Sequence, residues 1–328
     1  MRRRVLSGPV LTAVIVFAGG CVGGGAEAEQ SVPLFDDSTT AQPDGGDETA
    51  STLTTTTLSV AERLPELDAD VTGAVRSSDG ALLPVIDTDG EVWFVVGSCG
   101  DEQIEPRGSA EVVGAQHVVL DPGDGDGDDR AASINLALAL RTSELLEADG
   151  VAVVLTNAGT AAMSGSTRSA TGPSVGARAF VSIHHPNADG PVTDEARPSI
   201  VHRADDSESR RLAGLLHEEL VAAFASLGGE FAAHEEAGVR PLLNQRGEDF
   251  FRVLRIDGDL AGVRADLLPL GENEATLLAT EEGRDLEAQA LATAIARFLV
   301  TEEEGNGFVD PIESVRNAPT TNSPGGCG

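Results

Sequence analysis

The sequence lacks tyrosine and lysine, and aromatic residues make up only 3% of its 328 residues. Its 41% hydrophobic content therefore predicts a core of alanine, valine and leucine, and the length allows roughly two domains. All basic residues are arginines, and the formal net charge is -32. Such an acidic surface repels the phosphates of nucleic acids and the headgroups of anionic lipids, so we exclude nucleic-acid binding.

The N-terminal apolar run, residues 10–17, is too short for a comfortable membrane span. It follows three arginines and precedes small residues and Cys21, which is the pattern of a secretory signal. A cysteine after small residues resembles a bacterial lipoprotein signal, in which that cysteine is lipidated. We therefore predict that residues 1–21 are a lipoprotein-type signal. The chain would be lipid-anchored to the outer face of the cytoplasmic membrane or secreted to the cell wall, with no other membrane contact.

Cysteine is also scarce, because only Cys99 and Cys327 remain besides Cys21. A remaining pair of cysteines in an exported protein suggests a disulfide. A Cys99–Cys327 disulfide would join the C-terminal tail to the N-terminal part of the folded chain. Two unrelated thiols are the alternative.

Composition divides the rest of the chain into four segments. Residues 22–66 are rich in small polar residues and predict a disordered tether. Residues 67–113 contain strand-like runs at 71–75, 82–86 and 92–96, separated by hairpin-type turns, and predict a small β module. Residues 114–301 then form the main domain, and 302–328 are a polar tail.

The main domain alternates apolar strands with amphipathic helices. Strands are predicted at 117–121, 151–156 and 179–183, and helices at 133–148, 207–227 and 285–300. Residues 159–178 favour helix only weakly, and Gly172-Pro173 is expected to break it. The alternation predicts an α/β fold with a mixed twisted sheet flanked by helices.

Two of these strands end in residues suited to chemistry. Residues 117–125 end an apolar run with Asp121-Pro122-Gly123-Asp124, and residues 179–187 end with His184-His185. Ligands bind beyond the carboxyl ends of strands in open α/β sheets. If the two strands are neighbours, their carboxylates and imidazoles lie together at one edge of the sheet, which we call the mouth.

These stretches together resemble the zinc-dependent N-acetylmuramoyl-L-alanine amidases, which cleave the amide between N-acetylmuramic acid and L-alanine in peptidoglycan. The resemblance spans residues 118–299 in the family's order, and its pieces are residues 117–125, 135–139, 154–156, 180–185 and 274–278. It implies a mixed sheet flanked by helices (an amidase-type, phosphorylase/hydrolase-like fold). It also implies peptidoglycan as the ligand, and the exported, tethered context fits that ligand.

The resemblance implies three zinc ligands, His, Glu and His, and a Glu that moves protons. Three protein ligands leave a position for a water whose pKa falls to about 7. His184 stands at one histidine position, but Asp124 replaces the other, and Ala131 stands at the glutamate-ligand position. The proton-moving glutamate falls on Ala265. Asp266 is one residue away, a slip that turns a strand side chain to the opposite face.

Asp124 has three open interpretations. It can bind zinc through oxygen together with His184 and a neighbouring acid. The oxygen-rich set of Asp124, Asp126, Asp128 and Asp129 suits Ca²⁺ or Mg²⁺ better, although no glutamate follows at calcium-loop spacing. The third interpretation is a solvated acidic turn. Among nearby residues, we expect His185 to point away, Asp121 to fix its turn and Arg168 to be structural.

Two functional classes follow from these substitutions. The chain is either a peptidoglycan-binding relative that is catalytically impaired and lacks zinc or binds it weakly, or an active metal-dependent amidase. The active enzyme would use Asp124 and His184 with Asp266 as the substitute acid. A catalytically silent protein would bind peptidoglycan, or regulate another cell-wall amidase or a divisome component. Zinc content and release of peptides from peptidoglycan distinguish the two classes.

Overall fold

The computed structural model describes residues 59–108, 110–125, 128–158, 162–185, 200–225, 238–267, 276–278 and 280–315. All of them belong to one compact unit, Thr56–Gly328. The predicted signal segment with Cys21, almost all of the predicted tether, and Cys327 lie outside the described residues. Within the described part of the chain, every helix is too short or too polar to cross a membrane.

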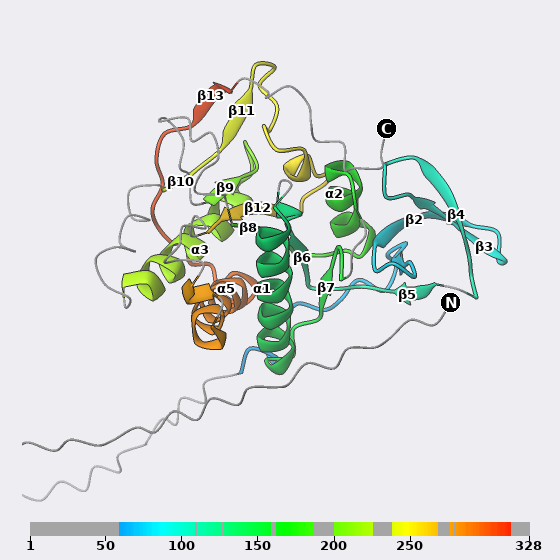
Figure 1. The fold of residues 1–328 in the computed structure, drawn as a ribbon, viewed down its shortest axis with the longest axis horizontal. Coiled ribbons are helices and arrows are strands. Elements are labelled where there is room, and N and C mark those ends of the chain that lie inside the picture. Colours follow the sequence, from blue (N-terminus) through cyan, green and yellow to red (C-terminus); the bar gives the residue numbers. More distant parts are fainter. Residues whose placement is uncertain are drawn as a thin grey trace, which may run out of the picture. The chain divides into compact units, whose positions relative to one another are not determined.

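A six-stranded sheet forms the centre of the main domain, in the order β10-β9-β12-β8-β6-β7 (Figure 1). Strands β7, β6, β8 and β12 run parallel, whereas β9 is antiparallel to β12. The predicted mixed sheet is thereby confirmed. Its strands are β6 (Val118–Pro122), β7 (Val153–Leu155), β8 (Ala179–His184), β9 (Ile200–His202), β10 (Val239–Arg240) and β12 (Ala261–Asp266).

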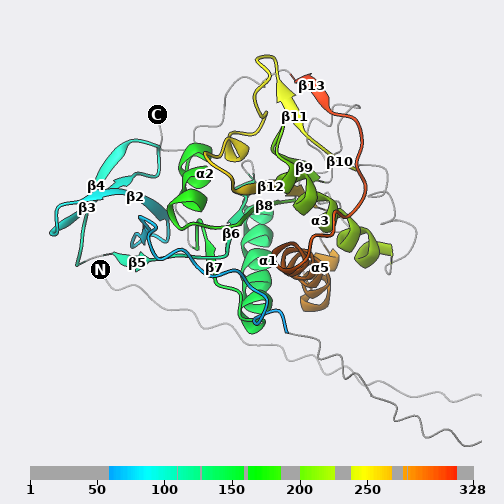
Figure 2. The same ribbon diagram turned by 180° about the vertical axis from the view of Figure 1, so that it is seen from behind.

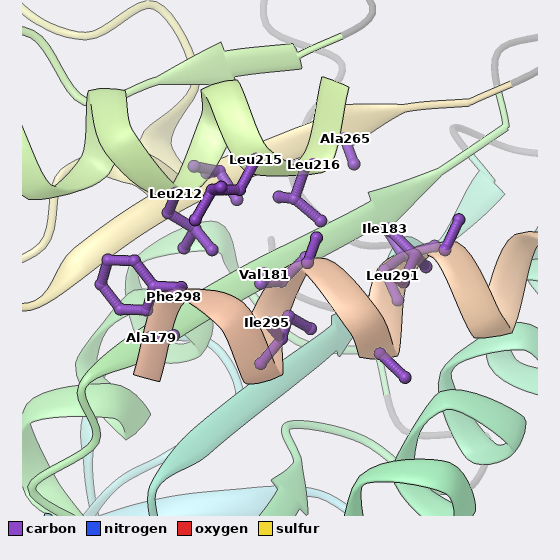
Figure 3. Close-up of a cluster of buried hydrophobic side chains, with 14 of the residues drawn as sticks. Ala179, Val181, Ile183, Leu212, Leu215, Leu216, Ala265, Leu291, Ile295 and Phe298 are labelled. Atoms are coloured by element: carbon purple, nitrogen blue, oxygen red, sulfur yellow. The ribbon is translucent and has the colours of Figure 1, made fainter. Parts of the chain in front are cut away.

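Three long helices cover one face of this sheet: α1 (Asp129–Ala148), α3 (Ser207–Ala225) and α5 (Glu281–Val300). Their leucines pack on inward-facing residues of β8, and Figure 3 shows Val181 and Ile183 beside Leu291 and Ile295 of α5. Helix α1 begins four residues before its predicted start, because the Asp128 side chain caps it by accepting from the backbone N–H groups of residues 130 and 131.

The opposite face carries α2 (Gly165–Ser174) and the short helix η3 (Arg252–Leu254). The expectation that Gly172-Pro173 breaks the helix is wrong, since α2 continues through Pro173 and ends one residue later. Gly172 has a packing role instead. A Cβ at this position would lie 2.2 Å from Leu260 Cδ2, so the missing side chain lets α2 approach its neighbours closely.

The β module is an antiparallel sheet of order β4-β3-β2-β1-β5, which lies beside α2 in both views (Figures 1 and 2). Three strands were predicted, and the edge strands were missed because β4 is mostly polar and β5 has only three residues. The module is hydrogen-bonded to the main domain just beyond β7, where the Leu82 N–H donates to the Thr156 carbonyl over 2.8 Å. Its strands are β1 (Ala74–Arg76), β2 (Leu82–Thr88), β3 (Val92–Val96), β4 (Glu102–Pro106) and β5 (Glu111–Val113).

The predicted polar tail is not structureless at its start. Strand β13 (Ile312–Val315) pairs in parallel with β11 (Leu242–Asn244). Phe308 also pairs with Val239, and the Arg210 guanidinium lies 3.5 Å from the Phe308 ring centre. A few apolar residues among polar ones are enough to form a strand here, because the main domain supplies the strand with which it pairs.

Candidate functional site

The carboxyl ends of β6, β8 and β12 meet at one edge of the sheet. Strands β6 and β8 are direct neighbours, as predicted, with Asp121 opposite Ser182. Strand β12 lies on the other side of β8, with Asp266 opposite His184. The polar residues of three strands therefore share one mouth.

Asp121 is the centre of a buried hydrogen-bond network at this mouth, rather than only a turn residue. Its carboxylate is fully buried and accepts from the hydroxyls of Thr156 and Ser182, each over 2.6 Å. Arg168 of α2 adds an ion pair, with 3.2 Å between Nη1 and Oδ2. This ion pair agrees with the structural role expected for Arg168. Through these contacts Asp121 ties together β6, β7, β8 and α2.

The same network determines how His184 is protonated. The Ser182 hydroxyl donates to Asp121, so its oxygen accepts from His184 Nε2–H over 2.9 Å. His184 is 3% exposed, and burial lowers its pKa well below the usual value. The nearby guanidinium groups of Arg264 and Arg168 lower this pKa further. His184 is therefore a neutral imidazole with its lone pair on Nδ1, the form that binds metals.

Gly123 lies directly against this imidazole. A Cβ on Gly123 would come within 2.4 Å of His184 Nδ1, so only glycine permits the approach. The Gly123 N–H also donates to the Ile183 carbonyl over 2.8 Å. The Pro-Gly turn and the end of β8 are consequently fitted to each other.

The acidic loop before α1 offers few ligands in the part that the structure describes. Asp124 is exposed. Asp128 is used as the N-cap of α1, and Asp129 lies in the first helical turn. Asp126 lies outside the described residues.

Alanines occupy two positions where the family resemblance implies glutamates. Ala131 is fully buried and packs with Leu278 and Ile134. Ala265 is fully buried in the core that α3 and α5 cover, opposite Ile183 in the sheet (Figure 3). Both methyl groups contribute to apolar packing and offer no metal ligand.

Asp266 lies on the face of the sheet where His184 lies, because the two residues are paired across parallel strands. As expected, Asp266 and Ala265 face opposite sides of the sheet, and the face that also carries His184 is that of Asp266. Arg264 Nε donates to Asp266 Oδ1 over 2.8 Å, and its guanidinium lies 4.0 Å from the Phe251 ring centre.

His185 points to the helix side, as expected. Its Nδ1 contacts Asn135 Oδ1 of α1 at 2.7 Å, and its Nε2 contacts Glu287 Oε2 of α5 at 3.0 Å. Glu287 was missed from the sequence, although its position four residues before Leu291 on the apolar stripe of the helix could have indicated a buried carboxylate.

The donors that the structure describes do not fit the family's zinc set. No three His, Cys, Asp or Glu side chains in the described ranges gather closely enough to hold a metal ion. Of the implied ligands, His184 is suited to binding and Ala131 is not.

Cys99, His117 and His202 take part in contacts other than those at the mouth. Cys99 is disulfide-bonded, and its predicted partner Cys327 lies outside the described residues. His117 and His202 each hydrogen-bond to backbone carbonyls, over 3.0 and 2.7 Å.

The N-acetylmuramoyl-L-alanine amidase family matches residues 118–297, which is more than half of the chain, and the chain belongs to this family. The family is zinc-dependent and acts on peptidoglycan, which places its members outside the cytoplasm. No curated protein matches the chain.

Solved amidases resemble the chain at low identity. The CwlD amidase from Clostridioides difficile in complex with the GerS lipoprotein is 22% identical, with a TM-score of 0.45 over 56% of this chain and 98% of that one. AmiC2 of Nostoc punctiforme is 23% identical, with a TM-score of 0.41 over 56% and 97% of the two chains. The catalytic domain of CwlV from Bacillus (Paenibacillus) polymyxa is 23% identical, with a TM-score of 0.43 over 56% and 98%.

Proposed function

We propose that this chain is a cell-surface member of the amidase family that binds peptidoglycan, or regulates a partner amidase, without hydrolysing the amide. The observation that carries the proposal is the burial of Ala131 and Ala265 in apolar contacts. A methyl group neither binds zinc nor accepts a proton. The family's third ligand and its proton carrier are thus missing together.

Amide hydrolysis needs both an activated water and a polarised carbonyl, and the family derives both from one zinc ion with an open position. Losing a ligand usually weakens such a site strongly, because three protein ligands set both affinity and geometry. Because Ala131 and Ala265 stand at the two glutamate positions and Asp124 replaces a histidine, His184 alone is a poor basis for catalysis. Binding of the glycan or its peptide requires none of these groups.

An active metal-dependent amidase is the second candidate, and the alignment of Asp266 with His184 favours it. In that case Asp124 and His184 would hold the metal, and Asp266 would take a proton from water. Its ion pair with Arg264 weighs against this role, because a carboxylate held by a guanidinium is less available to a water molecule.

Three measurements on the purified exported chain separate the candidates. We expect less than stoichiometric zinc, no release of alanine-bearing peptides from purified peptidoglycan, and retention on insoluble peptidoglycan that chelator does not change. Stoichiometric zinc that disappears in His184→Ala or Asp124→Ala, together with peptide release, would establish the enzyme instead. Failure to bind peptidoglycan both with and without chelator would contradict the binding proposal.

We further propose that Cys21 is lipidated and holds the domain at the outer face of the membrane through residues 22–66. This arrangement is supported by the signal-like N-terminus and by the extracytoplasmic substrate of the family. A Cys21→Ser chain should then leave the membrane fraction.

A further inference from the structure

His185, Asn135 and Glu287 form a buried polar cluster on the helix side of the strand ends. Their exposed fractions are 3%, 0% and 1%. They come from the end of β8, the second turn of α1 and the second turn of α5. Buried polar groups are costly unless they are hydrogen-bonded, so the pattern of donors and acceptors decides what the cluster does.

The proton on one side of the imidazole is assigned by Asn135. Asn135 Nδ2 donates to the Gly123 carbonyl over 3.0 Å, which directs its amide oxygen toward His185. An amide oxygen only accepts, so His185 Nδ1 carries a proton and donates it. The orientation of Asn135 is thus determined by the backbone of the Pro-Gly turn.

The other ring nitrogen shares a proton with Glu287. His185 Nε2 and Glu287 Oε2 are 3.0 Å apart, and one proton lies between them in either of two forms. The pair is an imidazole with a carboxylic acid, or an imidazolium with a carboxylate, and both forms have zero net charge. Because both ring nitrogens are engaged, His185 neither binds a metal nor acts on a ligand in this arrangement.

We infer that this cluster holds the mouth together without a metal. In a zinc amidase the metal joins α1 to the strand ends through its ligands, whereas here Ala131 offers none. Asn135 lies one turn further along α1 and links the helix to Gly123 and His185, and Glu287 adds α5. This inference rests on the proposed non-catalytic function, because it explains how the ligand-binding edge keeps its shape without zinc.

The inference is tested by melting temperatures of the full exported chain in chelator, using His185→Leu, Glu287→Leu and the double variant. Removing one member leaves the buried group on the other unpaired, whereas removing both leaves only the Asn135 amide oxygen without its partner. Each single variant should melt roughly 10 °C lower, and the double variant should recover a substantial part of that loss. Gln289→Leu, at an exposed position on the same helix, should melt like wild type.

Glu287→Gln is the conservative variant, because its amide N–H can still donate to His185 Nε2. It should melt closer to wild type than Glu287→Leu does. In ¹⁵N-labelled protein, His185 should show a protonated Nδ1 and a proton at Nε2 that exchanges slowly with solvent. If the losses in melting temperature caused by the two leucine substitutions add up in the double variant, the cluster does not hold the mouth. The same conclusion follows if chelator lowers the melting temperature of wild type.

The peptidoglycan pull-down separates this inference from the proposed function. If wild type fails to bind while the melting pattern is as expected, the proposed function is wrong and the metal-free link stands. If wild type binds and the melting pattern is absent, the link is wrong and the binding function stands.

Discussion

Two adjacent histidines end strand β8, and they are used in opposite ways. His184 and His185 are both 3% exposed. His184 bonds toward α2 through Ser182 and leaves Nδ1 against Gly123, whereas His185 has both nitrogens engaged on the helix side. Equal burial of the same residue type therefore says little about function. What distinguishes the two residues is that His184 keeps a lone pair on Nδ1 at the mouth, whereas both ring nitrogens of His185 are engaged.

The two sides of the strand ends also differ in what surrounds the histidines. On the His184 side lie carboxylates and guanidinium groups, namely Asp121, Asp266, Arg168 and Arg264. On the His185 side lie the buried Ala265 and one enclosed carboxylate, that of Glu287. His184, at a ligand position that the family resemblance assigns, lies on the polar side, whereas Ala131 and Ala265, at two other assigned positions, are packed in apolar contacts.

Restoring the lost ligands should have the largest effect. The double variant Asp124→His with Ala131→Glu would supply a full His, Glu and His set with His184. If only the ligands are missing, the purified variant should contain about one zinc per chain by metal analysis. Adding His184→Ala to the same variant should remove the zinc. A variant that folds but stays metal-free would mean that the mouth itself has changed shape.

Removing the charge of the Asp121 network should have the next largest effect. Asp121→Asn leaves the Arg168 guanidinium, whose side chain is 12% exposed, without its ion pair. Breaking a buried pair costs about 3–5 kcal/mol of unfolding free energy, measurable by urea denaturation. The matched control, Asp124→Asn on the exposed loop, should change stability by less than about 0.5 kcal/mol. Equal effects of the two variants would refute the network.

The smallest expected effect is a pH dependence caused by His184. Its pKa is depressed in the folded state, so the unfolded chain binds more protons once the pH falls below about 6.5. Stability should be unaffected by this group above that pH and should fall by roughly 1.4 kcal/mol per pH unit below it.

His184→Asn removes this titration. The difference in unfolding free energy between wild type and the variant should therefore depend on pH between about pH 5 and 6.5 and become constant above it. A difference that stays constant over the whole range would show that His184 does not need to be neutral.

Local patterns in the sequence were sufficient for the elements and for part of the mouth. Apolar periodicity predicted β6, β8 and the three long helices, and turn residues placed Asp121 and His184 at strand ends. Edge strands β4 and β5 and the strand β13 were missed, because their stability comes from pairing rather than from their own residues. Pro173 was overestimated as a breaker because it lies in the last turn of α2, where continuing the helix matters least.

By itself, the sequence determined that an amidase-like sheet would carry His184 at a strand end, and that Ala131 would offer no ligand. Only the tertiary structure decided that Asp266 shares a face with His184, that Asp121 binds Arg168, and that Glu287 meets His185. These pairs are 82, 47 and 102 residues apart in the chain, a difference of their residue numbers. Which partners meet across such separations depends on strand register and helix packing, which no local pattern specifies.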